Sequence, residues 1–256
     1  MKNYLKAYLK YRPLFYSLIR PREAGLFRGI VPFDKPIMDF GCGDGFFTDV
    51  FYGDLGKMEV GVDIDSGQLK KAKRLNIYEK LVKYDQKKLP FPDNYFSTVI
   101  SNCVLEHVEN LNHDIKEVNR ALKLKGVFIC TVMTDKWEDY FFGKRLFGSY
   151  YGKWMRKIQI HPNLFSKNMW DAIFEKHGFE ITKTVGYLDK KASMWIDVLH
   201  YLSIGSLISH KLFNKWVLFP ERTYFIPEIL FKNEKKNIPV NKSAALFYVL
   251  KKKKLQ

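Results

Sequence analysis

The sequence predicts an α/β domain built on a doubly wound, mostly parallel sheet with helices on both faces. Between residues 36 and 134, short apolar runs alternate with amphipathic segments, which is typical of strand–helix units. A glycine-rich turn directly follows the first apolar run. The chain has 256 residues, of which 46% are hydrophobic, so it can bury a substantial core and is not disordered as a whole.

The alternating elements can be assigned in chain order. We expect strands at residues 36–40, 58–64, 80–84, 95–101 and 126–132, and helices at residues 46–55, 66–78 and 111–123. Ser66 is the expected N-cap of the second of these helices. A helix that begins after Ser166 and ends at Gly178, followed by strands at 179–188 and 243–250, completes the prediction.

Two helical regions accompany this pattern. Residues 1–28 are expected to form a helical arm, which Pro13 kinks or breaks. Residues 192–231 are expected to be mostly helical, with one stripe of polar residues and broadly apolar residues elsewhere. We expect this helix to be buried on most of its surface by its own domain, by a second subunit or by a membrane interface.

The net charge of +16 is concentrated at the two ends of the chain, with +6 over residues 1–30 and +7 over residues 231–256. A basic surface suits nucleic acid, anionic lipid headgroups or a phosphorylated substrate, or it serves solubility alone. Three scattered cysteines without a C-x-x-C pair indicate neither a disulfide framework nor a metal site. No apolar run is long enough for a spanning helix, and the N-terminal segment lacks the apolar stretch of a secretion signal.

The segment IMDFGCGDG (residues 37–45) carries the clearest chemical signal. Its glycines allow a tight turn and a close approach of a ligand to the main chain, but Phe46 stands where a dinucleotide fingerprint needs glycine. Asp39, Asp63 and Asp85 would lie at the carboxyl ends of three consecutive strands, where open α/β sheets bind ligands. Acidic groups there suit a ligand that has a nucleoside and a positive charge and lacks phosphates.

Over residues 36–134 the sequence resembles the class I S-adenosylmethionine-dependent methyltransferases. The resemblance is carried by DFGCGDG, GVDID, YDQKKLPFPDNYFSTVISNCVLEHV and the segment KEVNRALK before a strand. It implies a Rossmann-like sheet of seven strands, mostly parallel with an antiparallel last strand, and a helical cap inserted before that strand. The chain then divides into an N-terminal helical arm (1–30), a cofactor-binding core (31–134) and a C-terminal part of the sheet with the substrate cap (135–256).

The resemblance implies that S-adenosylmethionine is the cofactor and assigns these residues to its site: Asp39, Gly41, Gly43, Asp63, Ile64, Asp85, Gln86 and Asn102. Asp39 and the main chain of the two glycines would hold the methionine part, with Asn102 near it. Asp63 would accept hydrogen bonds from the ribose hydroxyls. The adenine would lie against Ile64, with its amino group at Asp85 and the main chain of Gln86.

Two departures from the family pattern put the turn geometry, rather than cofactor binding, in question. Ser97 stands in place of a usual aspartate, and KLKG (residues 123–126) stands in place of the usual Pro-Gly-Gly. Neither position normally touches the cofactor. A catalytically silent member of the family, acting as a binding protein, therefore stays open beside the enzyme hypothesis.

Methyl transfer from a sulfonium needs mainly the alignment of the acceptor, and an oxygen acceptor also needs a base. The candidate bases are Glu106 and His107, just after the fourth strand, and His161 in the cap. Each has a structural alternative. His107 could be a helix residue among polar neighbours, His161 could cap a loop, and Glu106 could pair with a lysine or arginine.

Nucleic acid is disfavoured as the acceptor. SNCV (residues 101–104) replaces the Asn/Asp-Pro-Pro-Tyr box of adenine-N6 enzymes, and no proline precedes Cys103 as in cytosine-C5 enzymes. The aromatic residues between positions 137 and 154 either stack on sugar rings or pack in the core. Similarity to methyltransferases of surface-glycan and lipid-linked saccharide pathways favours an oxygen of such a molecule, with quinone, lipid or other small-molecule metabolism as the alternative.

The cellular setting follows from the same features. We expect a cytoplasmic protein, either free or peripheral at the inner face of the membrane. The apolar helix at residues 194–219, together with the basic ends of the chain, would rest on an anionic membrane face or form a homodimer interface. The sequence leaves these two hypotheses open.

Overall fold

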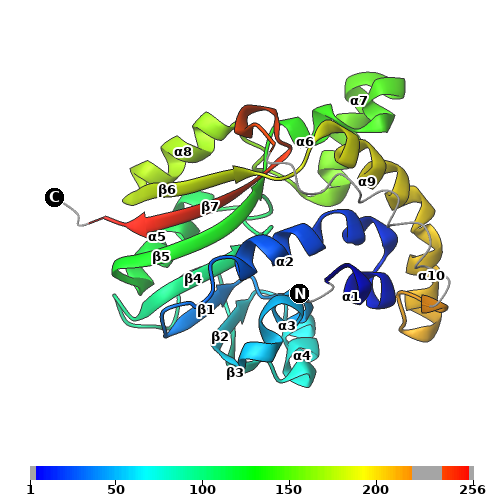
Figure 1. The fold of residues 1–256 in the computed structure, drawn as a ribbon. Helices are drawn as coiled ribbons and strands as arrows, with labels where there is room; N and C mark the ends of the chain where they lie inside the picture. Colours follow the sequence, from blue (N-terminus) through cyan, green and yellow to red (C-terminus); the bar gives the residue numbers. More distant parts are fainter. Residues whose placement is uncertain (1–3, 221–237, 254–256) are drawn as a thin grey trace.

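The computed structural model describes residues 4–220 and 238–253, and a seven-stranded sheet in the order β3-β2-β1-β4-β5-β7-β6 forms its centre (Figure 1). The strands are β1 (Ile37–Phe40), β2 (Met58–Asp63), β3 (Tyr78–Lys83), β4 (Phe96–Asn102), β5 (Leu122–Met133), β6 (Phe179–Gly186) and β7 (Ala245–Lys252). Neighbouring strands are parallel except where β7 pairs with β5 and β6. The predicted sheet, mostly parallel with an antiparallel last strand, is confirmed.

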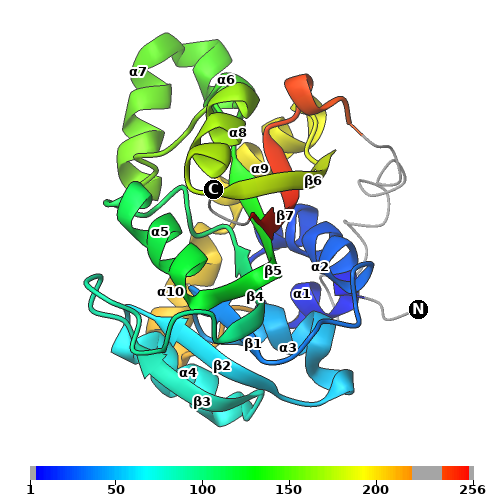
Figure 2. The same ribbon diagram turned by 90° about the vertical axis from the view of Figure 1, so that its left-hand side faces the viewer.

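Helices cover both faces of the sheet, as Figure 2 shows, with α2 and α3 on one face and α5 and α8 on the other. The helices are α1 (Tyr4–Tyr11), α2 (Arg20–Arg28), α3 (Phe46–Tyr52), α4 (Ser66–Leu75), α5 (Leu111–Ala121), α6 (Lys136–Asp139), α7 (Phe142–Gln159), α8 (Lys167–Lys176), α9 (Lys190–Leu202) and α10 (Ile204–Phe213). None of the helices in the described part of the chain is both long and apolar enough to span a bilayer.

The buried side chains form two layers, one on each face of the sheet. Successive strand residues point to opposite faces, so Ile100 packs with the α2 and α3 side while its neighbour Val99 packs with the α5 and α8 side. Ile129 and Phe128 divide in the same way on β5. The sheet thus has apolar residues on both sides, as a parallel sheet between two helical layers requires.

Most helix ends lie within a few residues of their predicted positions, but one predicted N-cap residue is wrong. Asp65, not Ser66, caps α4, because its Oδ1 accepts from the Gly67 amide at 2.6 Å and leaves Ser66 inside the helix. The helix ends at Leu75, three residues before the predicted end, because Asn76 adopts a left-handed φ of 56°. The predicted Ser166 cap of α8 is confirmed by its side-chain bond to the Met169 amide.

The N-terminal arm consists of α1, a 3-10 turn (Leu14–Leu18) and α2. Pro13 lies between α1 and this turn, so the predicted break is confirmed. The arm is part of the core, because Phe27 of α2 is fully buried and its ring lies 5.3 Å from that of Phe247 in β7. Its first three residues lie outside the described part of the chain.

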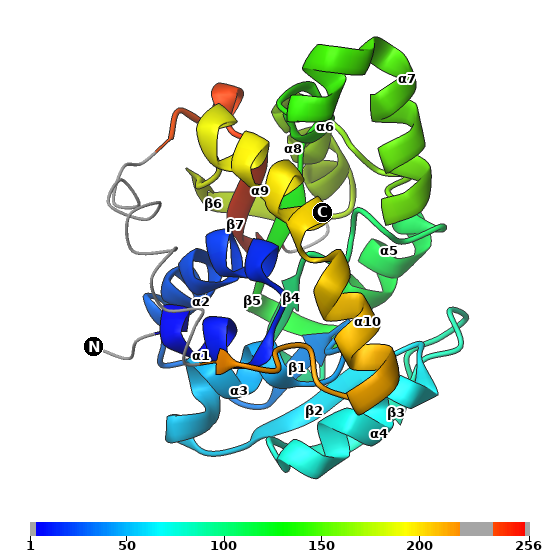
Figure 3. The same ribbon diagram turned by 90° about the vertical axis from the view of Figure 1, so that its right-hand side faces the viewer.

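The helical stretch expected at residues 192–231 is two helices, α9 and α10, which meet at Ser203. Residues 221–231 of that prediction lie outside the described residues, as do 231–237 and 254–256 of the basic C-terminal end. Figures 1 and 3 show α7, α9 and α10 together on the side of the molecule to which the parallel strands point.

The two departures from the family pattern lie side by side, Ser97 in β4 and residues 123–126 in the first part of β5. Ser97 Oγ donates to the Lys35 carbonyl at 2.7 Å and accepts from Lys123 Nζ at 3.1 Å. Lys125 takes a left-handed φ of 65°, and the β4–β5 register shifts between Phe96 and Thr98. These residues lie at the amino ends of β4 and β5. The candidate site described next lies at the opposite, carboxyl ends of the strands.

Candidate active site

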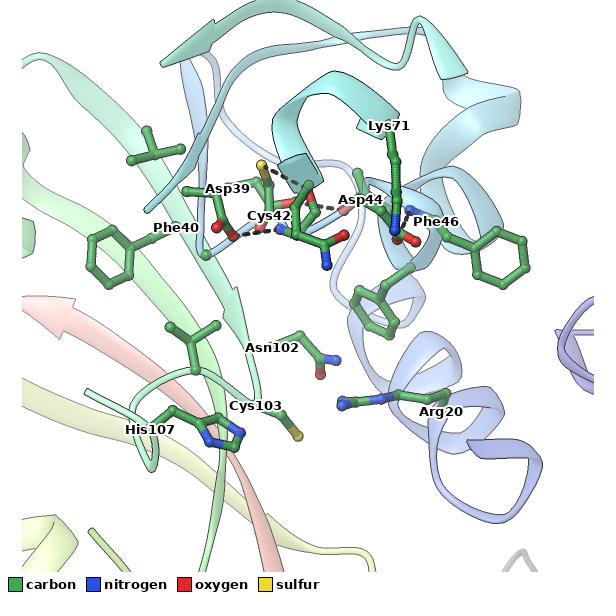
Figure 4. Close-up of a pocket in the computed structure, with 18 of the residues that line it drawn as sticks. Arg20, Asp39, Phe40, Cys42, Asp44, Phe46, Lys71, Asn102, Cys103 and His107 are labelled. Atoms are coloured by element: carbon green, nitrogen blue, oxygen red, sulfur yellow. Dashed lines mark hydrogen bonds between the residues drawn. The ribbon is translucent and has the colours of Figure 1, made fainter. Parts of the chain in front are cut away.

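A cavity of about 550 Å³ lies at the carboxyl ends of β1, β2 and β4 (Figure 4). One part of its wall, here called the glycine-turn half, consists of Asp39, Gly41, Gly43, Asp63 and Ile64. Another part, the arm half, consists of Tyr8, Tyr16, Arg20, His107 and Trp216. Asn102, at the end of β4, also lines the wall. The cavity therefore lies where open α/β sheets bind their ligands.

The glycine turn requires glycine for two different reasons. Gly41 has a φ of 77°, and a Cβ there would lie 2.3 Å from Val104 Cγ2, so a side chain would not fit. Gly43 has a φ of 54°, but a Cβ there would meet nothing within 4 Å. Gly43 thus exposes its main chain to the cavity, which allows a ligand to approach closely.

Asp63 is held rigidly at the end of β2. Its Oδ2 accepts from the Gly43 amide at 2.8 Å, and its Oδ1 accepts from the Asp65 amide at 2.8 Å. The next residue, Ile64, is 55% exposed although it lines the cavity. A fixed carboxylate beside an uncovered apolar side chain fits the ribose and the adenine of a nucleoside.

Asp39 is 4% exposed, and its Oδ2 accepts from Thr48 Oγ1 at 2.6 Å and from the Tyr78 hydroxyl at 2.5 Å. Burial raises the pKa of Asp39 to about 6, although these two hydroxyls oppose the rise. A cation in the cavity would stabilise the ionised form of this carboxyl group. Asp39 therefore fits the predicted positive end of the ligand, and the glycine-turn half as a whole fits S-adenosylmethionine.

Asp85 and Gln86 lie outside the cavity wall. Asp85 Oδ1 accepts from the Lys87 amide at 3.0 Å, and Gln86 has a left-handed φ of 62°, so both belong to a turn after β3. The preceding residue, Tyr84, does line the wall, and its hydroxyl donates to Asp114 at 2.6 Å. The adenine-amino roles of Asp85 and Gln86 stay predictions.

The three candidate bases differ in their access to the cavity. His107 lines the cavity, whereas Glu106 and His161 are buried behind its wall. Burial raises the pKa of Glu106, whose two oxygens have no hydrogen-bond partner among the described residues. Burial lowers the pKa of His161 to about 3, so this ring is neutral at physiological pH.

His107 has the geometry of a base. Its Nδ1 lies 2.8 Å from the carbonyl oxygen of Ile160, which can only accept, so Nδ1 carries a proton, and in the neutral ring the lone pair is then on Nε2. The ring of His161 packs against the ring of His107, with 4.5 Å between the two ring centroids. Of the three candidates, only His107 combines an available nitrogen with access to the cavity.

The turn that carries His107 is tied down at both ends. Cys103, with a φ of 52°, starts the turn, and its amide donates to Thr131 Oγ1 at 2.9 Å. Asn163, in the loop after α7, donates from Nδ2 to the carbonyls of Leu105 and Val108 at 2.9 and 2.6 Å. The region beyond β5 therefore fixes the position of His107.

Of the residues in the arm half, only His107 was predicted from the sequence as a site residue. Figure 4 shows the Arg20 guanidinium pointing from α2 toward Asn102 and Cys103. Arg20 Nη1 donates to Glu23 at 2.7 Å, and Glu23 also accepts from Asn102 Nδ2 at 3.0 Å and from the Tyr187 hydroxyl at 2.7 Å. One signal was available, because Glu23 is the only acidic residue among the first 30 and is fully buried.

The cap aromatics between positions 137 and 154 do not line the cavity. Trp137 and Tyr151 are buried in the core, while Tyr150 and Trp154 are exposed elsewhere on the surface. The aromatic residue that reaches the cavity from the cap is Trp216, three residues after the end of α10. Of the two hypotheses for these aromatics, core packing holds for Trp137 and Tyr151.

Comparisons with known proteins place this arrangement in a family. A family model described as a methyltransferase domain matches residues 38–130. A malonyl-[acyl-carrier protein] O-methyltransferase of Legionella pneumophila is 30% identical over 181 residues, which are 68% of this chain and 57% of that protein. An uncharacterised protein of Methanocaldococcus jannaschii is 30% identical over 159 residues, which are 62% of this chain and 67% of that protein.

Solved structures show the same fold. A protein of Thermotoga maritima, described as an S-adenosylmethionine-dependent methyltransferase, has a TM-score of 0.61 at 18% identity and covers 94% of this chain and 92% of its own. The chain spans a little over half the length of the Legionella relative (57%). From the sheet order, the glycine turn and these matches together, the chain belongs to the class I S-adenosylmethionine-dependent methyltransferases.

Proposed function

We propose that this protein transfers the methyl group of S-adenosylmethionine to an oxygen of a glycan or of a lipid-linked saccharide intermediate. The observation that supports the proposal is the position of His107 at the cavity wall, where its Nδ1 donates to the Ile160 carbonyl and Nε2 is the nitrogen left to accept a proton. A hydroxyl acceptor needs such a base, because its proton must leave as the new bond forms.

When bound, S-adenosylmethionine supplies an electrophilic methyl group. Asp63 and Ile64 would hold its nucleoside, and Asp39 with the main chain of Gly43 would hold its methionine part. His107 would accept the proton of the acceptor hydroxyl. Tyr8, Tyr16 and Trp216 of the arm half provide aromatic surfaces of the kind on which sugar rings stack.

A second candidate is methyl transfer to a carboxylate of a small molecule or carrier-bound acid. Arg20 favours it, because its guanidinium lies at the cavity with only Nη1 bonded to Glu23 among the hydrogen bonds of the described residues. A carboxylate is already nucleophilic and needs no base. The Legionella relative is named for such an O-methyl transfer.

The test is to incubate the protein with labelled S-adenosylmethionine and with glycan, lipid and small-acid extracts. The proposal predicts label in a saccharide fraction, where it forms a methyl ether, and loss of that product in His107→Ala. His113→Ala is the matched control, since His113 lies outside the cavity and contacts the Lys87 carbonyl. Label confined to a methyl ester, formed equally by His107→Ala, would favour the second candidate and contradict the first.

A further inference from the structure

We propose that the outer face of α7, α9 and α10 binds an anionic lipid bilayer at the level of the headgroups. Large apolar side chains that are at least 60% exposed define this apolar face: Leu146, Phe147, Tyr150, Leu202, Leu212 and Phe213. Figure 3 shows the three helices along one side of the molecule. Exposed apolar side chains gathered on neighbouring helices mark a site of interaction.

In α9 and α10, by contrast, the serines, the histidines and the one aspartate are buried or half-buried. Asp197 of α9 is 2% exposed and accepts from the Gly143 amide at 2.9 Å and from the Tyr151 hydroxyl. Ser203 and Ser209 are also buried, at 5% and 6% exposed. A helix that borders water has the opposite arrangement, with its apolar side toward the protein. α10 departs from that arrangement, because Ile204, Leu207 and Ile208 are more than half exposed, so its outer side is suited to an apolar medium.

The charges around the apolar face complement an anionic surface. The three helices contain eight lysine and arginine residues and one acidic residue, the buried Asp197. Arg145, Lys153, Lys157 and Lys211 are exposed beside the apolar side chains. Basic residues that flank exposed aromatic and aliphatic side chains are typical of helices that lie in a membrane interface.

The same charges disfavour a second copy of the chain as the partner. In a two-fold symmetric dimer the same surface meets itself, so these cations would face one another with no exposed carboxylate on the three helices to pair with them. Lysine is also depleted at the centre of protein interfaces. An anionic bilayer has neither difficulty.

The position of the apolar face gives it a consequence for the cavity. Trp216, three residues after α10 ends, lines the same cavity as Asp39 and His107. Docking would therefore bring the cavity close to the headgroups, where a lipid-linked acceptor would be found. This consequence rests on the proposed function, whereas the docking itself does not.

The test is to sediment the full chain with vesicles of phosphatidylcholine alone and with vesicles that also contain phosphatidylglycerol. We expect binding to the anionic vesicles that weakens as salt is raised. Leu212→Asp should lower the partition coefficient by about tenfold or more, because a leucine side chain would no longer enter the apolar layer. Lys153→Glu with Lys157→Glu should lower it by about fivefold per cation, on the anionic vesicles only.

Leu124→Asp is the matched control, because Leu124 is also exposed but lies at the amino end of β5, away from the apolar face. It should bind vesicles like the unchanged chain. Absence of vesicle binding would overturn the proposal. If light scattering without lipid then showed a dimer, the apolar face would be identified as an interface between copies of the chain. Vesicle binding without methyl transfer would contradict the proposed function alone.

Discussion

The glycine-turn half and the arm half of the cavity are built from the chain in different ways. The glycine-turn half comes from two neighbouring strand ends, and its carboxylate Asp63 is held by main-chain amides of nearby residues. The arm half takes Arg20 from α2, His107 from the turn after β4 and Trp216 from beyond α10. The first depends on local geometry, and the second depends on how distant segments pack.

This difference separates the roles of the two halves. The shape of the glycine-turn half is set by main-chain amides and by glycines that cannot be replaced. This half therefore suits a cofactor that is the same in every reaction cycle. The side chains of the arm half come from helices and turns outside the sheet, so the arm half suits a specific acceptor. Substitutions in one half should therefore leave the function of the other half intact.

The largest effect is expected for His107→Ala. Loss of a general base should lower kcat for a hydroxyl acceptor by about a hundredfold to ten-thousandfold. The dissociation constant for S-adenosylmethionine should stay unchanged, since His107 belongs to the arm half. Steady-state kinetics with calorimetry on the same sample separate the two quantities, and a parallel loss of cofactor affinity would break the comparison.

The next effect concerns Asp39, whose pKa of about 6 in the folded chain lies above its ordinary value of 3.8. Between these values the folded chain binds more protons than the unfolded chain, so the free energy of unfolding falls as pH rises through this window. Above pH 6 the buried carboxylate costs about 3 kcal/mol, because each pKa unit corresponds to 1.36 kcal/mol.

Asp39→Asn should therefore stabilise the chain by up to about 3 kcal/mol above pH 6 and leave its stability unchanged below pH 3.8. Cofactor affinity should fall in the same variant, because the asparagine carries no charge. Urea unfolding at both pH values measures the first effect. A variant that is less stable at high pH would show that the Thr48 and Tyr78 hydroxyls need the carboxylate more than burial penalises it.

The smallest effect is expected for Arg20→Lys. Lysine keeps a positive charge beside the buried Glu23 but lacks the planar guanidinium, so the fold should be retained. We expect KM for the acceptor to rise by about tenfold, the equivalent of one hydrogen bond to a charged group. The cofactor dissociation constant should not change. If the unchanged chain and Arg20→Lys had equal KM values for the acceptor, Arg20 would not contact the acceptor.

The sheet and the glycine-turn half were predictable because their signals are local. Apolar runs alternate with helical segments along the chain, and the left-handed turn at Gly41 admits only glycine. The Ser66 cap was predicted wrongly by one residue, since Asp65 and Ser66 are both good caps and only the backbone conformation decides between them.

Apart from His107, the arm half was not predictable from local pattern. Nothing in residues 4–28 indicates that α1 and α2 fold back over the carboxyl ends of the strands, because this depends on side chains such as Phe27 packing against β7. The polar stripe on residues 192–231 was visible, but the sequence could not tell which side would face the protein. Asp197 and its buried partners determine that orientation.

Calorimetric titration with S-adenosylmethionine and with its demethylated product tests the division of the cavity most directly. We expect micromolar binding of both ligands to the unchanged chain. Asp63→Ala should weaken this binding by about a hundredfold, because the charged group proposed to accept the ribose hydroxyls is removed. Asp65→Ala, which removes the α4 cap outside the cavity, should bind normally. If the unchanged chain bound neither ligand, or if Asp63→Ala bound S-adenosylmethionine as tightly as the unchanged chain, the glycine-turn half would not be the cofactor site.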